Sequence, residues 1–199
     1  MTEHPHRPQQ ADPVARELLQ SVVDTARAIF GAEASSIFLY DENADELVFE
    51  AVSGEGQDIL VGERFPAGRG LAGWVAHSGE PVVVDDLSRS SAFARELAES
   101  TNYVPNSLMA APVTYSSTVL GVLEILDPSP QARSGLGELE VLALFARQAG
   151  IALTSVACLR NGRGPVALPT LAVFQDLDET SRAASLRTLE AVREMLLAR

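Results

Sequence analysis

The chain has 199 residues, which favours one domain with appended segments, and its 46% apolar content is sufficient for one buried core. Its net charge is −12, and a surface this acidic repels phosphate backbones, which argues against nonspecific binding of nucleic acid. A single cysteine, Cys158, excludes an intrachain disulfide and a zinc site built from several cysteines.

Residues 1–12 are polar and rich in proline, and we expect them to form a disordered tail. They contain no apolar segment of the kind that marks a secretory signal. No other stretch approaches the run of about 20 apolar residues that spans a bilayer. We therefore expect a cytoplasmic protein that does not associate with membranes.

The first predicted element is a helix that begins at Pro13, because apolar residues recur there at spacings of three and four, and that ends at Gly31. Strand-like runs separated by turn-rich sequence follow. They predict strands at 35–40, 46–52, 82–84, 107–115 and 119–127. Residues 53–70 are glycine-rich and are expected to be mostly loop. Short helices are expected after this loop, at 71–77 and 88–101.

A long helix with one apolar face is predicted from about Gly137 to Leu159. Residues 161–177 contain glycine and proline and are expected to form a linker, and residues 178–199 predict a last helix with an apolar stripe. Tight hairpins rather than helical crossovers join the strands, so the sequence predicts an α+β domain with an antiparallel sheet.

Residues 65–86, 107–126 and 142–153, in this order and spacing, resemble three segments of the GAF domain family. Residues 65–86 are similar to the family's G-x-G-[IL]-x-G-x-[VA] turn and helix, followed by its G-x-P-[VL]-x-[VI]-x-D strand. Residues 107–126 resemble its paired strands, and residues 142–153 resemble its closing helix. The resemblance implies a GAF domain over residues 13–160, with about six antiparallel strands. Its terminal helices would pack on one face of the sheet, and a roofed ligand pocket would lie on the other.

The resemblance also suggests where a ligand would bind, because the family places ligands between the sheet and a roof, formed here by residues 71–104. Seven candidate ligand-binding residues follow: Trp74, Val84, Phe93, Tyr103, Ser107, Met109 and Glu124. Glu124 is unusual, because a carboxylate on a buried sheet face needs a partner. It is either a polar anchor for a ligand, or it bonds a roof residue or is exposed. Ordinary core packing is the alternative for Trp74 and Phe93.

The residues that define several ligand-binding branches of the family are missing. Cyclic-nucleotide GAF domains usually carry Asn-Lys after the last strand and then Phe-x-x-x-Asp-Glu, but Asp127-Pro128 and residues 134–139 do not match these motifs. Cys158 lies outside the roof, which argues against bilin attachment and against a free methionine sulfoxide reductase. The roof loop 102–106 has no histidine for haem, and no metal-binding or catalytic motif is present. We therefore expect no cofactor, no metal and no enzyme activity.

The sequence predicts a sensory or regulatory module that binds an unidentified small molecule. It would signal through a homodimer formed by its terminal helices or through a partner protein. Two alternatives remain: a protein-interaction module without a ligand, and an enzyme of unrecognised type. A cavity on the order of a few hundred Å³ with converging polar groups would favour a ligand, whereas a packed core would favour the interaction module.

Overall fold

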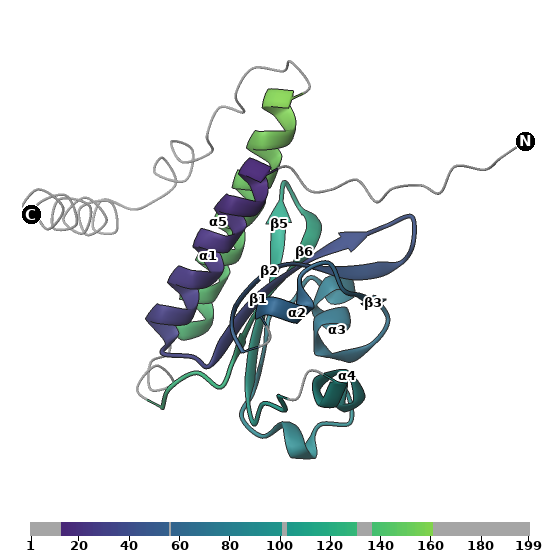
Figure 1. The fold of residues 1–199 in the computed structure, drawn as a ribbon, viewed down its shortest axis with the longest axis vertical. Coiled ribbons are helices and arrows are strands. Elements are labelled where there is room, and N and C mark those ends of the chain that lie inside the picture. The colour runs from purple at the N-terminus through teal and green to yellow at the C-terminus, as the bar shows by residue number, and fades with distance from the viewer. Residues whose placement is uncertain (1–12, 56, 101–102, 131–136, 161–199) are drawn as a thin grey trace, which may run out of the picture. The chain divides into compact units, whose positions relative to one another are not determined.

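The computed structural model describes residues 13–55, 57–100, 103–130 and 137–160 (Figure 1). Nearly all of them belong to one compact unit, which ends at Ala157. The predicted tail at 1–12, linker at 161–177 and C-terminal helix at 178–199 lie outside the described residues.

A six-stranded sheet forms the centre of this unit, with the strand order β3-β2-β1-β6-β5-β4 and only antiparallel pairs. The strands are β1 Ala34–Asp41, β2 Glu46–Gly54, β3 Arg64–Pro66, β4 Val82–Val84, β5 Leu108–Tyr115 and β6 Thr118–Leu126. Tight turns close the β1–β2 and β5–β6 hairpins, with positive φ angles at Asp45, Ser116 and Ser117. The predicted α+β fold with about six antiparallel strands is confirmed.

Helices cover both faces of this sheet (Figure 1). They are α1 Pro13–Phe30, α2 Gln57–Leu60, α3 Gly70–Ser78, the 3₁₀ turn η1 Leu87–Arg89, α4 Arg95–Ser100 and α5 Glu138–Arg160. The predicted helix at 88–101 is in fact η1 and α4, with residues 90–94 between them. The predicted loop at 53–70 contains α2 and β3, which are too short to show a periodic pattern.

The long helices α1 and α5 share one buried core with one face of the sheet. Leu19, Val23, Ala26 and Phe30 follow the helical repeat along α1 and are buried there. The other members of this helix-side core are Leu142, Ala146 and Ala149 of α5, and Ile37, Ala51, Met109, Ala111, Val113, Leu123 and Ile125 of the sheet. Burial of these side chains fixes which residues of each strand face the other way.

In the described part of the chain, one stretch, Glu138–Ala157 in α5, has the length and composition to cross a membrane. The sequence patterns did not predict a stretch of this length and composition. The buried face of α5, with Leu142, Ala146 and Ala149, packs in the helix-side core. Only 28% of the stretch is buried inside the protein, and one helix of this length and composition is weak evidence for a membrane span.

Two glycines allow the backbone of neighbouring elements to approach closely. A Cβ atom on Gly150 of α5 would meet the carbonyl group of Thr114 in β5, and one on Gly121 of β6 would meet that of Phe38 in β1. The expectation that a side chain does not fit at Gly121 is confirmed. At Gly150 the contact sets how near α5 lies to the sheet.

Replacing Gly150 tests this close approach. Gly150→Ala gains about 1 kcal/mol in helix propensity, but its methyl group forces α5 away from β5. We expect a net loss of about 1–2 kcal/mol in the free energy of unfolding, measured by urea denaturation followed by circular dichroism. Gly68→Ala is the control, because no atom lies near its added Cβ and its φ is not positive. Unchanged stability of Gly150→Ala would contradict the close packing of α5.

Candidate functional site

The second face of the sheet carries a separate core, which the short helices cover. Its aromatic centre is formed by Phe38, Phe49 and Phe65. The ring centroids of Phe38 and Phe49 lie 4.4 Å apart, and Phe38 meets Phe65 edge-on at 5.3 Å. The remaining buried members of this roof-side core are Leu47, Val52, Ala67, Leu71, Ala72, Val75, Leu87, Leu108, Ala110 and Val122.

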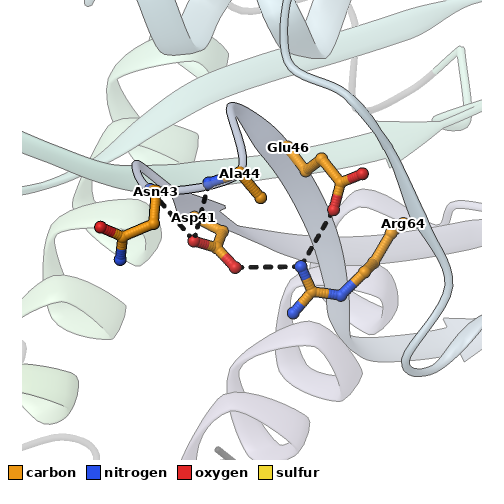
Figure 2. A network of polar contacts seen from close by, with 5 residues as sticks. All are labelled: Asp41, Asn43, Ala44, Glu46 and Arg64. Atoms are coloured by element: carbon orange, nitrogen blue, oxygen red, sulfur yellow. Dashed lines mark hydrogen bonds and ion pairs between the residues drawn. The ribbon is translucent and has the colours of Figure 1, made fainter. Parts of the chain in front are cut away.

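A polar network at the sheet edge holds the short strand β3 in place (Figure 2). Nη1 of Arg64 donates to Oδ2 of Asp41 at 2.9 Å and to Oε2 of Glu46 at 3.0 Å, and Oδ1 of Asp41 accepts the backbone N–H groups of Asn43 and Ala44 (Figure 2). The bond from Arg64 lowers the pKa of Asp41. Exposed pairs of this kind contribute little stability, so their main effect here is positional: they place Phe65 under the roof.

A cavity of about 90 Å³ lies between the sheet and this roof. Most of its walls are apolar, and the polar groups are few. The residues that line it are Glu55, Leu60, Phe65, Arg69, Gly70, Leu71, Ala72, Phe93, Ala94, Ala98, Tyr103, Pro105, Leu108, Glu124 and Leu126. At its rim, Gly70 has a φ of +75°, and a Cβ there would lie 3.1 Å from Cβ of Ala94. The start of α3 and the segment before α4 therefore approach closely.

Glu124 of β6 extends into this cavity and is only 8% exposed. The neighbouring residues Leu123 and Ile125 are fully buried in the helix-side core, so strand alternation directs Glu124 to the roof side. Burial raises the pKa of Glu124 to about 8, and within the described residues no hydrogen bond or ion pair reaches its carboxyl group. A buried carboxyl group of this kind either stays protonated or pairs with a hydrogen-bond donor or a positive charge that the described residues do not supply.

The phenol of Tyr103 anchors the roof to the end of β6. Its hydroxyl donates to Oδ2 of Asp127 at 2.6 Å. Oδ1 of Asp127 accepts the N–H groups of Asn106 and Ser107, each at 2.9 Å, and the hydroxyl of Ser107 at 3.1 Å. Burial, together with the bond to Asp127, raises the pKa of Tyr103, so the phenol remains neutral. This network fixes the position of Tyr103 in the wall of the cavity.

Two exposed charged residues, Glu55 and Arg69, also border the cavity. Nη2 of Arg69 lies 3.1 Å from Oε2 of Glu96, and both side chains are more than half exposed. Arg69 is the one basic residue among the described cavity-lining residues, and it is directed at this surface carboxylate. The interior of the cavity therefore carries one ionisable carboxyl group and no cation to balance it.

The cavity brings together three of the seven residues expected from the sequence: Phe93, Tyr103 and Glu124. Trp74 lies on α3 with 47% of its surface exposed, so it belongs neither to the cavity nor to a core. The other three, Val84, Ser107 and Met109, line a different hollow of about 140 Å³, which the paired strands β4 and β5 form together with Pro128 and Glu138. Met109 does not face the roofed cavity, because alternation along β5 places its side chain in the helix-side core.

Several lining residues were not among the sequence candidates. Leu108 and Leu126 are cross-strand partners, and Leu126 lies two residues from Glu124, so the period of two could have identified both. Leu60 and Phe65 lie on α2 and β3, in the segment that was expected to be loop. No periodic signal in the sequence marks them.

Comparison with known proteins agrees with this geometry. The family model of the GAF domain matches residues 15–153. The chain belongs to the GAF domain family. Among solved structures, the GAF domain of a phosphoenolpyruvate-protein phosphotransferase from Coxiella burnetii has a TM-score of 0.65 at 22% identity, covering 76% of this chain and 88% of that one. The second GAF domain of DevS from Mycobacterium smegmatis has a TM-score of 0.60 at 21% identity, covering 74% and 99%.

Two further relatives show how widely this GAF fold is used. A probable 3',5'-cyclic phosphodiesterase of Caenorhabditis elegans is 23% identical over 141 residues, which are 66% of this chain but 19% of that protein. The free methionine-R-sulfoxide reductase of Neisseria meningitidis has a TM-score of 0.58 at 20% identity, covering 70% of this chain and 78% of that one. GAF domains are sensory and regulatory modules of larger proteins, and the same fold also occurs in an enzyme.

The buried carboxyl group of this GAF domain makes its stability depend on pH. The pKa of Glu124 is about 8 in the folded state and 4.5 ordinarily, so the folded state holds the proton more tightly and stability falls as pH rises from 5 to 8. Over this range the free energy of unfolding of the wild type should fall by on the order of 3 kcal/mol, and Glu124→Gln should not show this fall. Urea denaturation at each pH measures both. Glu55→Gln, at an exposed carboxyl on the same cavity, should follow the wild type. Parallel pH profiles for Glu124→Gln and wild type would contradict the burial of a free carboxyl.

Proposed function

We propose that this protein is a sensory or regulatory module that binds a small molecule in the roofed cavity, with Glu124 as the polar anchor. One observation carries the proposal: Glu124 is buried in an otherwise mostly apolar cavity with no partner in the described part of the chain. The carboxyl group has no partner among the described side chains, so a ligand that carries a hydrogen-bond donor or a positive charge would gain a bond there. Perturbed ionisable groups in clefts cluster at functional sites.

The cavity, at about 90 Å³, is smaller than the few hundred Å³ that would by itself favour a ligand over a module that only binds other proteins, so the case for a ligand rests on Glu124. A roof packed entirely on the sheet would leave no hollow, whereas about 90 Å³ is found here. This is larger than the roughly 30 Å³ that one water occupies in the liquid. It is smaller than the pockets of about 300–1,000 Å³ that hold drug-sized molecules. The ligand would therefore be a molecule, or a part of one, with few heavy atoms.

A regulatory role also agrees better with the lining than catalysis does. None of the described residues that line the cavity is a cysteine or a histidine, and Cys158 is the one cysteine of the chain. A thiol-based reductase mechanism needs a nucleophilic thiol and a resolving thiol at its site. The similarity to a methionine sulfoxide reductase thus concerns the fold rather than these reactive groups.

A cavity-filling variant tests ligand binding without changing any charge in the cavity. Ala98 of α4 borders the cavity, and we expect Ala98→Leu to weaken retention of the ligand by about tenfold or more through lost volume. Native mass spectrometry of the protein purified from its own host measures the retained molecule. Glu99→Leu adds a leucine at an exposed position of the same helix and should retain the ligand. Wild type that retains nothing, and that no compound stabilises in a metabolite screen, would refute the proposal.

The proposed output is a homodimer formed through α1 and α5. Both helices pack on the same face of the sheet, and each exposes apolar side chains on its outer surface. Val14, Leu18 and Ile29 of α1 are 40–56% exposed, and Val141 and Leu144 of α5 are 37% and 59% exposed. Spacings of three and four place Val14 with Leu18, and Val141 with Leu144, on common helix faces. A second copy of the chain would cover these side chains, and docking of a signalling partner is the alternative.

Charge substitution at this surface tests the dimer. Leu144→Arg places a charge where the second copy would pack, and we expect it to shift the protein from dimer to monomer, as measured by light scattering after size exclusion. Leu144 is 59% exposed, so the folded monomer tolerates the change. Ile59→Arg alters an equally exposed apolar residue of α2 and should leave the mass unchanged. A monomeric wild type, or a dimer that survives Leu144→Arg, would contradict the proposed interface.

A further inference from the structure

We infer that the cavity takes a small organic cation, whose ammonium or guanidinium group pairs with Glu124 while its apolar part fills the space beneath the roof. This inference rests on the proposed function and names the class of ligand. It starts from the charge inside the cavity, which is one carboxyl group without a counterion among the described residues.

The ionisable groups around the cavity disfavour an anionic ligand. Those among its described lining residues are Glu124 within it, Glu55 and Arg69 at its rim, and the Tyr103 phenol, which is held by Asp127. Arg69 is turned toward Glu96 at the surface. Above about pH 8, where Glu124 is ionised, an anion 4 Å from its carboxylate would be repelled by about 4 kcal/mol, for an effective dielectric constant of 20. At neutral pH the protonated acid offers an anion no opposite charge. Cyclic nucleotides and other phosphates are anions of this kind.

A cation gains more from this site than a neutral hydrogen-bond donor does. A bond between a cation and a carboxylate is roughly twice as strong as one between neutral groups. The rings of Phe65, Phe93 and Tyr103 also line the cavity, and aromatic faces attract cations. The guanidinium of Arg95 already lies 6.0 Å from the centroid of Phe93. The net charge of −12 raises the local concentration of cations around the protein.

The walls define the rest of the ligand. Leu60, Leu71, Leu108 and Leu126 supply apolar surface and no fixed hydrogen-bonding groups on their side chains. A volume of about 90 Å³ equals about three waters of the liquid. A short alkyl chain attached to the charged group matches these limits.

Binding of a cation has a consequence that a neutral ligand lacks. Glu124 is mainly protonated at neutral pH in the unliganded protein and becomes a carboxylate when it pairs with the cation. Its proton then passes to the buffer, so binding at pH 7 releases close to one proton for each ligand bound. Affinity for the cation should rise with pH up to about 8, where Glu124 is ionised without help from the ligand.

A set of nearly isosteric probes, butylammonium, butanol and butyrate, separates the ligand classes by isothermal titration calorimetry. Butylguanidinium is added as the guanidinium probe. We expect the ammonium or guanidinium probe to bind the full chain about tenfold or more tighter than the alcohol, and butyrate not to bind. Titrations in buffers of different ionisation enthalpy should show the released proton.

Two variants assign these effects to Glu124. We expect Glu124→Gln to weaken binding of the cation by about tenfold or more and to abolish proton release, with the affinity for the matched alcohol unchanged. Glu55→Gln should bind the cation as the wild type does, because Glu55 is exposed. Circular dichroism of both variants verifies that they are folded.

The outcomes distinguish this inference from the proposed function. If an alcohol or a carboxylate binds as tightly as its ammonium and Ala98→Leu abolishes that binding, the cavity is a ligand site but the inference is wrong. Failure of every cationic probe to bind, or full binding to Glu124→Gln, also overturns it. If in addition no molecule is retained by the native protein, the proposed function falls as well.

Discussion

The two faces of the central sheet are kept apart by the side-chain alternation of β6, and the rest of the structure depends on this constraint. Leu123 and Ile125 are fully buried in the core beneath α1 and α5. Val122, Glu124 and Leu126 must then point to the roof. A shift of register by one residue would exchange the two sets and bury Glu124 under the long helices. Gly121 also helps to fix the register of β6 against β1, because the carbonyl of Phe38 occupies the space that a side chain at position 121 would need.

The segment after β6 joins the cavity to the helix layer. The Asp127 carboxylate holds Tyr103 of the roof, and the backbone N–H of Asp127 donates to the carbonyl of Ser107 at 3.0 Å. Two residues later, the N–H of Ser129 donates to the carbonyl of Phe30 at the end of α1, also at 3.0 Å. Asp127 thus contacts the cavity wall, and Ser129 contacts a helix with exposed apolar side chains. A ligand that moves Tyr103 would therefore act on α1 through the hydrogen bonds of Asp127 and Ser129.

Sequence patterns predicted the long, periodic elements well and the short ones poorly. The limits of α1 and α5 lie within one residue of expectation, because their apolar repeat runs over several turns. β3 and α2 have three and four residues, and tertiary contacts such as those of Arg64 with Asp41 and Glu46 determine them. Glu124 stood out in the sequence as a charge in an apolar strand. Trp74 and Met109 looked similar as candidates, but only tertiary structure shows that Trp74 is exposed and that Met109 faces the helices.

A leucine at position 124 would complete the roof-side core, so the carboxyl group lowers stability where it stands. Its raised pKa limits this cost, because a neutral acid is buried more cheaply than an ion at pH 7. The cost nevertheless grows as pH rises, and an ion-paired ligand would remove it by supplying the missing charge. Ligand binding and folding stability are thereby coupled through one side chain. A core that is stable without a ligand but gains stability when a counterion enters is suited to report the presence of that counterion.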